Sequence, residues 1–316
     1  MGIIIEQYKK TVLPRFQESK GVYYFTYKDF PSLKHEKHSV DSEGNLLKGY
    51  LYYYTNYKRN YLIVYAHGLG GGHHSDMHEI ELLARNGYQV FAFDFTGFCE
   101  SEGEDAISLS HSLVDLSNVI EYCKKNLSFK HLYLMGHSMG GYAVGNVANF
   151  VDGIEKVVMV SPFVSISSGV DGFLISKRGP LWNFIKKRIK KYETRINEKY
   201  YKSSLFDALL HENIKFFIAH SRDDSIVPYE LNCKRLEEKC KGKNVTFYVV
   251  NGKNHNPNYS SSAVSYLGRV FSSLNDLTSS SETKNDKFKN VDWNKVTEQD
   301  EEFWNKVIAF LNEGEK

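Results

Sequence analysis

A serine flanked by glycines is the feature of this sequence that most directly suggests chemistry. Ser138 forms the pattern G-x-S-x-G with Gly136 and Gly140, after a β-rich run and before a helix-like run of small residues. A nucleophilic serine sits in a strained turn of this kind, and the glycines let strand and helix pass closely. The helix N-terminus also favours negative charge that develops there. The pattern therefore predicts Ser138 as a nucleophile.

A serine hydroxyl needs an adjacent base, and the base needs an acid that orients it. Asp223 and Asp224 stand in HSRDDSIVP directly after one predicted strand, and His255 stands in YVVNGKNHNP after the next. Open α/β sheets build their sites at these carboxyl ends of strands. We therefore predict Ser138, Asp224 and His255 as the catalytic group, with Asp223 as the alternative acid.

The glycine-rich run AHGLGGGHH follows a third predicted strand and can supply an oxyanion hole. We assign the backbone amides of Leu69 and Met139 as its donors. The same run belongs to a histidine cluster that has a second interpretation as a zinc site, made of His67, His73, His74 and His78. No carboxylate or thiolate pattern accompanies these imidazoles, so we favour a site without metal. Without a metal, we predict that His67 is a structural part of the loop and also contacts the substrate. His73 or His74 is predicted to lie at the rim of the site.

The elements that would position these residues alternate between strand and helix, which is typical of a mostly parallel sheet with helices on both faces. The predicted strands are residues 21–27, 48–54, 61–67, 88–94, 131–136, 156–161, 214–220 and 245–250. The predicted helices between the later strands are residues 76–86, 109–125 and 139–150.

Residues 163–206 interrupt this alternation and are predicted to form a helical cap between core segments 1–162 and 207–316. An apolar stripe of helical spacing runs through the cap, made of Trp182, Ile185, Ile189, Tyr192 and Ile196. Residues 177–202 contain ten Lys or Arg against two Glu. The helix that carries this stripe has two interpretations. It is either an ordinary cap helix whose basic face points to solvent, or a lid whose basic face attracts acidic substrates or an anionic membrane surface. Trp182, Phe184 and Ile185 could line an acyl pocket.

The C-terminal part of the chain turns polar, and we expect a linker over about residues 272–290. A last helix is then predicted from Thr297. Its apolar stripe would dock it on the core through Trp304, Val307, Ile308 and Leu311.

The segments HGLGGG, GHSMGG, DSIVP and NGKNHN together resemble the α/β-hydrolase superfamily, most closely its serine aminopeptidase, monoacylglycerol lipase and lysophospholipase-like branch. The resemblance implies an eight-stranded sheet, a cap after the sixth strand, and hydrolysis through an acyl-enzyme without metal or organic cofactor. In such relatives the acid stands where Asp224 does. One segment departs from the family pattern, because DFTGFCES at residues 94–101 has Thr96 where the family has arginine.

Composition limits the partners. The 316 residues carry a net charge of +2, which provides no global field for nucleic acid. The four cysteines are widely spaced and the N-terminus resembles neither a signal peptide nor a membrane span, so we expect an unanchored cytosolic protein. A small carboxylic ester, a monoacylglycerol or a lysophospholipid is the expected substrate. The alternatives are an aminopeptidase or thioesterase with the same residues, and a binding protein on a hydrolase scaffold; the oligomeric state stays open.

Overall fold

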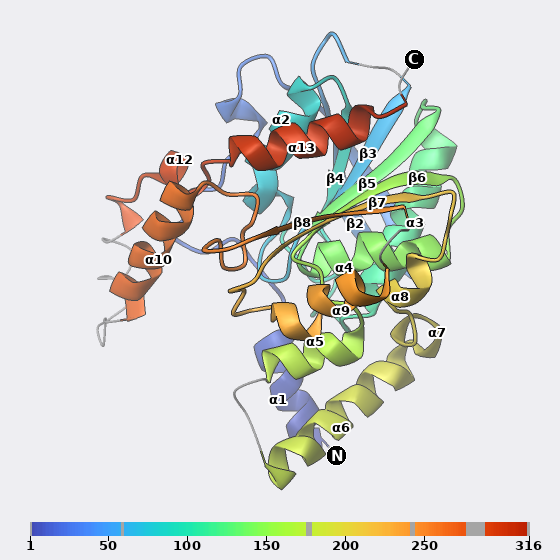
Figure 1. Ribbon diagram of the computed structural model, residues 1–316, viewed down its shortest axis with the longest axis vertical. Helices are drawn as coiled ribbons and strands as arrows, with labels where there is room; N and C mark the ends of the chain where they lie inside the picture. The colour runs from blue at the N-terminus through green and yellow to red at the C-terminus, as the bar shows by residue number, and fades with distance from the viewer. Residues whose placement is uncertain (1, 58–59, 175–178, 241–243, 276–287, 315–316) are drawn as a thin grey trace.

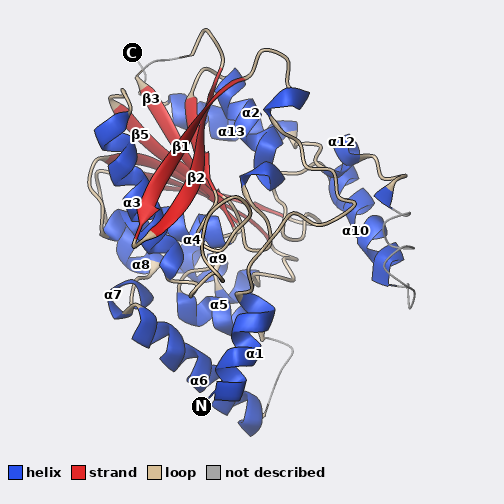
Figure 2. Cartoon of the chain, turned by 180° about the vertical axis from the view of Figure 1, so that it is seen from behind, coloured by secondary structure: helices blue, strands red, loops and turns tan. Residues whose placement is uncertain are grey.

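The computed structural model describes residues 2–57, 60–174, 179–240, 244–275 and 288–314, and shows one central sheet covered by helices on both faces (Figure 1). The strands are β1 (Lys34–Ser42), β2 (Asn45–Tyr53), β3 (Tyr61–Ala66), β4 (Gln89–Phe93), β5 (His131–His137), β6 (Ile154–Val160), β7 (Lys215–Ser221) and β8 (Val245–Val250). They lie in the order β1-β2-β4-β3-β5-β6-β7-β8. The pairs from β4 to β8 are parallel, whereas β1 and β2 form an antiparallel hairpin that joins the sheet at β4 (Figure 2).

Helices connect the strands and extend the chain beyond them. Those of seven or more residues are α1 (Gly2–Val12), α2 (Met77–Arg85), α3 (His111–Asn126), α4 (Met139–Asn146), α5 (Ile166–Phe173), α6 (Pro180–Ile196), α9 (Cys233–Lys239), α10 (Ser261–Asn275) and α13 (Glu301–Asn312). The shorter ones are α7 (Glu198–Tyr201), α8 (Leu205–Ala208), α12 (Trp293–Val296), and the 3-10 turns η1 (Tyr27–Asp29), η2 (His73–Asp76), η3 (Val147–Asn149) and η4 (Tyr229–Leu231). None of the described helices is both long and apolar enough to cross a bilayer.

The two faces of the sheet bury separate cores because side chains alternate along each strand. On β3, Leu62 and Val64 pack with α3, α4, α8 and α9, whereas Ile63 and Tyr65 pack with α2 and α13. The predicted stripe of α13 is therefore in place, with Trp304, Val307 and Leu311 buried. This helix begins at Glu301 rather than at Thr297, which ends α12.

The first predicted strand is wrong. Residues 21–27 form an extended loop and the start of η1, and the hairpin partner of β2 is β1 instead. The loop carries Phe25, whose ring packs edge-on against His78 of α2 at 4.3 Å between centroids. The aromatic residues of this segment favour a β-strand, but Phe25 is buried by packing against α2 and the segment pairs with no strand of the sheet. Glu43 and Gly44 form the turn that joins β1 to β2.

Helices α5 to α8 lie between β6 and β7, where the cap was predicted. Helix α6 runs beside α1 rather than standing alone (Figure 1). The division of the chain at residues 163 and 206 stays a prediction. Most of the expected linker, residues 276–287, falls outside the described residues, and its first part belongs to α10, which the sequence interpretation missed.

Candidate active site

Ser138 occupies a strained turn between β5 and α4. Its φ and ψ are 55° and −113°, a conformation that a residue with a side chain adopts only when the surroundings impose it. A Cβ atom on Gly140 would lie 1.9 Å from the carbonyl oxygen of Ala66, and one on Gly136 would lie 2.5 Å from the backbone of Gly140. The glycines therefore allow the close passage of strand and helix, as the sequence predicts.

Asp224 and His255 come together from the loops after β7 and β8. The ring Nδ1 of His255 donates to Oδ2 of Asp224 at 2.8 Å. The other carboxylate oxygen, Oδ1, accepts from the amides of Ile226 at 2.9 Å and Val227 at 2.8 Å. Asp223 instead accepts from the Ser221 hydroxyl and from loop amides. Of the two candidate acids, Asp224 is the one that contacts the imidazole.

The surroundings keep Asp224 ionised. Burial by itself would raise the pKa of this carboxyl, but the hydrogen bond and charge of His255 and the neighbouring His220 bring the pKa below its ordinary value. His220 is the penultimate residue of β7 and is fully buried. Its Nε2 donates to the Val227 carbonyl at 2.8 Å and lies 3.5 Å from Asp224 Oδ2. Burial lowers the pKa of His220, so its ring is neutral. Sequence reasoning gave His220 no role; its place at the end of a predicted strand was the available signal.

Backbone contacts bring the histidine loop to the serine turn. His137 Nε2 donates to the backbone carbonyl of His255 at 2.9 Å, and Ser161 Oγ donates to the same oxygen at 3.1 Å. The rings of His137 and His255 are 4.8 Å apart between centroids. Within the described residues no hydrogen bond joins the Ser138 hydroxyl to His255. Such bonds are often loose in unliganded enzymes and tighten with substrate.

The glycine-rich loop after β3 lies against the same turn. A Cβ atom on Gly68 would be 3.5 Å from Cβ of Ser138, so the loop backbone passes directly beside the serine. Across the described chain, neither the Leu69 amide nor the Met139 amide donates to a protein acceptor. Both are therefore available to an oxygen bound near Ser138.

His67 holds this loop in shape. Its Nδ1 donates to the Gly68 carbonyl at 2.7 Å, and its Nε2 accepts from the Phe95 amide at 3.1 Å. Burial lowers the pKa of His67 to about 4, which keeps the ring in this neutral form. Because both ring nitrogens are engaged, the geometry supports the structural role for His67 and leaves its substrate contact a prediction.

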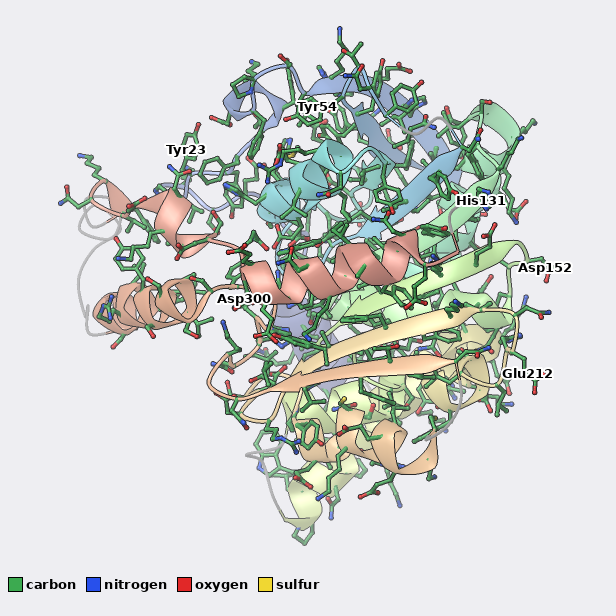
Figure 3. All side chains as sticks on the ribbon, turned by 45° about the horizontal axis from the view of Figure 1, so that its top comes forward. Tyr23, Tyr54, His131, Asp152, Glu212 and Asp300 are labelled. Atoms are coloured by element: carbon green, nitrogen blue, oxygen red, sulfur yellow. The ribbon has the colours of Figure 1, made fainter. Side chains whose placement is uncertain are left out.

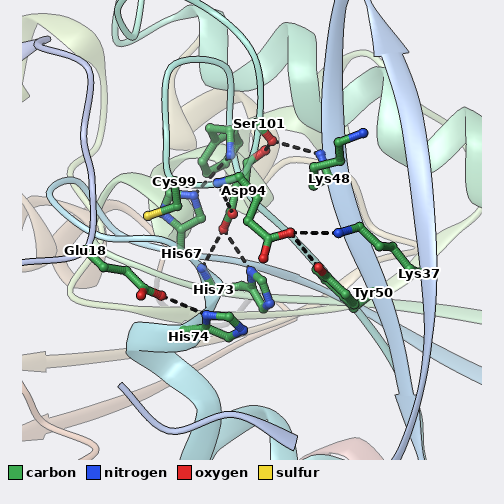
Figure 4. Close-up of polar contacts among 12 residues, drawn as sticks. Glu18, Lys37, Lys48, Tyr50, His67, His73, His74, Asp94, Cys99 and Ser101 are labelled. Carbon is green, nitrogen blue, oxygen red and sulfur yellow. Dashed lines mark hydrogen bonds and ion pairs between the residues drawn. The ribbon is translucent and has the colours of Figure 1, made fainter. Parts of the chain in front are cut away.

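The neighbouring histidines bind separate partners around a buried aspartate (Figure 4). His73 is buried; its Nδ1 and its backbone amide both donate to Asp94 Oδ1 at 2.8 Å. His74 donates to Glu18 at 2.8 Å. Of the two residues predicted for the rim, His73 is buried, whereas His74 is partly exposed and lines a pocket that adjoins the site. In the part of the chain that the structure describes, no group of three or more His, Cys, Asp or Glu side chains could hold a metal ion.

The atypical residue Thr96 binds a different buried acid. Its amide and hydroxyl donate to Asp115 at 2.7 and 2.9 Å. The Ser101 hydroxyl ties the end of the same turn to the Asp94 carbonyl at 2.6 Å. The turn that braces the site is therefore closed by short polar side chains in this protein.

A pocket of about 480 Å³ adjoins the site. It meets the site at the glycine-rich loop, at His137 and at Asn256, next to Ser138 and His255 in the chain. Its walls are the segment 22–25, α10 and α12. None of the three cap residues predicted to line an acyl pocket, Trp182, Phe184 and Ile185, lines this one. Phe184 is 47% exposed on α6, with the Arg188 guanidinium over its ring.

Comparisons with known proteins agree with the observed fold. The model of the α/β hydrolase fold family matches residues 61–176. The lysophosphatidylserine lipase ABHD12 of Danio rerio is 26% identical over 201 residues, which are 60% of this chain and 50% of that protein. The uncharacterized protein R595 of Acanthamoeba polyphaga mimivirus is 24% identical over 229 residues, 68% of this chain and 74% of that protein. The chain thus spans about half the length of the ABHD12 relatives it matches.

Solved structures show the same fold. The esterase Pf2001 of Pyrococcus furiosus superposes with a TM-score of 0.56 at 22% identity, covering 75% of this chain and 88% of that one. Est1E from Butyrivibrio proteoclasticus has a TM-score of 0.55 at 20% identity, covering 75% of this chain and 96% of that one. The eight-stranded, mostly parallel sheet and these matches show that the chain has the α/β-hydrolase fold.

Proposed function

We propose that this protein is a serine hydrolase that cleaves a carboxylic ester through an acyl-enzyme. The observation that carries the proposal is the 2.8 Å hydrogen bond from His255 to the buried Asp224, beside the strained turn that presents Ser138. A base oriented by an acid next to a serine hydroxyl is the arrangement that nucleophilic acyl transfer needs.

In the proposed reaction, Ser138 Oγ attacks the ester carbonyl carbon while His255 Nε2 takes the hydroxyl proton. His255 returns this proton to the alcohol oxygen as the C–O bond breaks, which leaves the acyl group on Ser138. Water then repeats the sequence, with His255 as base and the serine oxygen as leaving group. Asp224 stabilises the imidazolium throughout. The Leu69 and Met139 amides bind the oxyanion of both tetrahedral intermediates.

An ester is favoured over other acyl substrates by the relatives and by the pocket. The names of the relatives and neighbours include a lysophosphatidylserine lipase and an esterase. The pocket lies beside the glycine-rich loop after β3, residues 67–72, which we call the oxyanion loop. The pocket is lined largely by apolar side chains, among them Leu267, Val270 and Trp293. We propose a substrate with an aliphatic part, in the range from small esters to monoacylglycerols and lysophospholipids.

Hydrolysis of p-nitrophenyl esters of increasing chain length tests the proposal. We expect turnover that rises with chain length to an optimum, and its loss by about 10⁴-fold or more in Ser138→Ala. Ser128→Ala, which changes an exposed serine, is the matched control and should behave like the wild type. Aminoacyl amides and acyl-CoA run beside the esters decide between esterase, aminopeptidase and thioesterase. An inactive wild type would favour a binding protein on a hydrolase scaffold, whereas full activity in Ser138→Ala would refute Ser138 as the nucleophile.

We also propose a reducing, cytosolic setting. All four cysteines are free in the structure, and Cys123, Cys233 and Cys240 are buried. Burial raises the pKa of the Cys123 thiol, which keeps it protonated and unreactive.

A further inference from the structure

A buried carboxylate without a partner faces the pocket beside the oxyanion loop. Asp76 ends η2 at the start of α2 and is 7% exposed. It lines the pocket together with Leu69 and Gly71. Its Oδ2 atom is buried and has no hydrogen-bond partner in the described chain. Buried polar atoms are almost always paired, so an orphaned carboxylate oxygen at a pocket wall points to a ligand that supplies the donor.

Two more orphaned oxygens lie behind Asp76. Glu79, one helical turn along α2, is 1% exposed, and its Oε2 has no partner among the described residues. Its other oxygen, Oε1, accepts from Asn258 Nδ2 at 2.9 Å, while Asn258 Oδ1 is also buried and unpartnered. Gln299 and Tyr259 also lie within hydrogen-bonding reach of the Glu79 carboxyl, so Asp76 Oδ2 is the unpartnered oxygen that belongs to a residue of the pocket wall.

The electrostatics of the cluster agree with this missing partner. Burial, and then the like charge of Glu79, raise the pKa of Asp76 well above its ordinary value, and burial raises the pKa of Glu79 to about 7. In the described part of the chain neither carboxylate forms an ion pair with Lys, Arg or His. Asp94, the other buried aspartate of this region, has both oxygens bonded to donors. The Asp76 cluster thus has no cationic partner of its own, and an ammonium ion bound beside Asp76 would lower the pKa of this carboxyl and keep it ionised.

The remaining pocket walls suit the rest of such a ligand. Aromatic side chains gather around the opening, including Tyr23, Phe271 and Trp293. Figure 3 shows Tyr23 on the side of the molecule where α10 and α12 lie. Aromatic faces bind both aliphatic chains and cations, whereas the carboxylate at one wall selects for positive charge.

We propose that this pocket binds the part of the substrate that carries a primary ammonium group, with Asp76 as its acceptor and Glu79 and Asn258 completing the polar wall. This proposal rests on the hydrolase function proposed above, because it places the ammonium-bearing part of the substrate beside the oxyanion loop. It names a substrate class, an ester with an amine in its acyl or alcohol portion.

Direct binding tests the pocket without any need for catalysis. Calorimetry on the full chain compares n-hexylammonium with 1-hexanol, which has the same length and no charge. We expect the ammonium to bind at least tenfold more tightly, and Asp76→Asn to reduce this preference to less than threefold. Asp152→Asn, on the exposed far side of the sheet (Figure 3), should keep the wild-type preference. Unchanged hexanol binding by Asp76→Asn shows that the variant is folded, and Glu79→Gln provides a second variant with the same expectation. Equal binding of the two ligands, or an Asp76→Asn variant that keeps the preference, overturns the proposal.

Hydrolysis of matched esters then tests whether the amine belongs to the substrate. p-Nitrophenyl 6-aminohexanoate is compared with p-nitrophenyl heptanoate for the acyl side, and 6-aminohexyl butyrate with heptyl butyrate for the alcohol side. We expect at least a tenfold preference in kcat/KM for the amine in one pair, and its loss in Asp76→Asn. If free hexylammonium binds through Asp76 but neither amino ester is preferred, the ligand is a separate amine and the substrate assignment is wrong. If no ester is cleaved, the proposed function fails while the binding measurement still decides the site.

Discussion

At the scale of single residues, the structure separates two adjacent aspartates that the sequence presents as equivalent. Asp224 contacts the imidazole of His255. Asp223 connects the end of β7 to the loop after β8, because it accepts from the Ser221 hydroxyl and from the Gly252 amide. Residue types and spacing could place both aspartates at the carboxyl end of a strand. They could not say which side chain turns toward His255, because that depends on the backbone of the loop.

This separation predicts unequal effects of the two carboxamide variants. In Asp224→Asn the carboxamide can no longer favour the imidazole tautomer that accepts the serine proton, and we expect kcat for ester hydrolysis to fall by roughly 10³- to 10⁴-fold. Asp223→Asn is the matched control, and its activity should fall by less than about tenfold since it touches only loop groups. Both variants should melt cooperatively in a thermal scan. A larger loss in Asp223→Asn than in Asp224→Asn would reverse the assignment.

At the scale of elements, β3 to β7 were predictable because they are buried on both faces and form nearly continuous apolar runs. Strand β8 is an edge strand with partly exposed side chains, and its β-branched and aromatic residues made it predictable. Strand β8 matches its predicted bounds, and β3 to β7 match within about two residues. Strand β1 was missed because it is an edge strand, paired only with β2, and most of its side chains are partly or fully exposed. Helix α10 was missed because its many serines obscure the helical spacing of its apolar residues, which include Leu267 and Val270. These apolar residues line the pocket rather than a hydrophobic core. The pocket could not be predicted, since its walls come from segments far apart in sequence.

The cap is joined to α1 by a buried acid. Glu193 of α6 is fully buried, accepts from the Tyr8 hydroxyl at 2.8 Å, and also accepts from the amides of Leu109 and Ser110. Burial raises the pKa of Glu193 to about 7. Between about pH 4.5 and 7 the folded protein therefore retains a proton that the unfolded chain has lost. The free energy of unfolding must fall as pH rises through this window, and the loss is complete above pH 7.

Glu193→Gln keeps an acceptor at this position and removes the titration. Relative to this variant, the wild type should lose roughly 1–3 kcal/mol of stability between pH 5 and pH 8. Denaturant unfolding at the two pH values measures the free energy of unfolding of each protein. Glu79 titrates in both proteins, so its contribution cancels when the two are compared. Glu238→Gln, an exposed residue of α9, is the control and should follow the wild type. A pH dependence that is the same in Glu193→Gln and the wild type would contradict the buried-acid account.

At the scale of the whole molecule, one end combines exposed apolar and basic side chains on neighbouring helices. Ile3 of α1 is 84% exposed and Leu181 of α6 is 67% exposed, and Lys187 and Lys191 are exposed on α6. The two helices lie side by side (Figure 1). We propose that this surface contacts an anionic membrane, because apolar residues among lysines are the pattern that interfacial helices use.

Co-sedimentation with liposomes tests this surface. The wild type should pellet with phosphatidylserine vesicles at low salt and be released as salt rises. The double variant Lys187→Glu and Lys191→Glu should stay in the supernatant. Charge reversal at the exposed Lys125 and Lys130 is the control for net charge and should leave binding intact. Equal loss in both double variants would show that only net charge matters.

The central claim is that Ser138 is a nucleophile activated by His255, and covalent labelling with a fluorophosphonate tests it most directly. Mass spectrometry of the digested adduct should place the label on the peptide that contains Ser138, and Ser138→Ala should take up none while Ser128→Ala labels like the wild type. His255→Ala, if folded by its thermal transition, should label at least about 100-fold more slowly because the serine loses its base. Undiminished labelling of Ser138→Ala, or a label on another residue, would contradict the assignment of the active site.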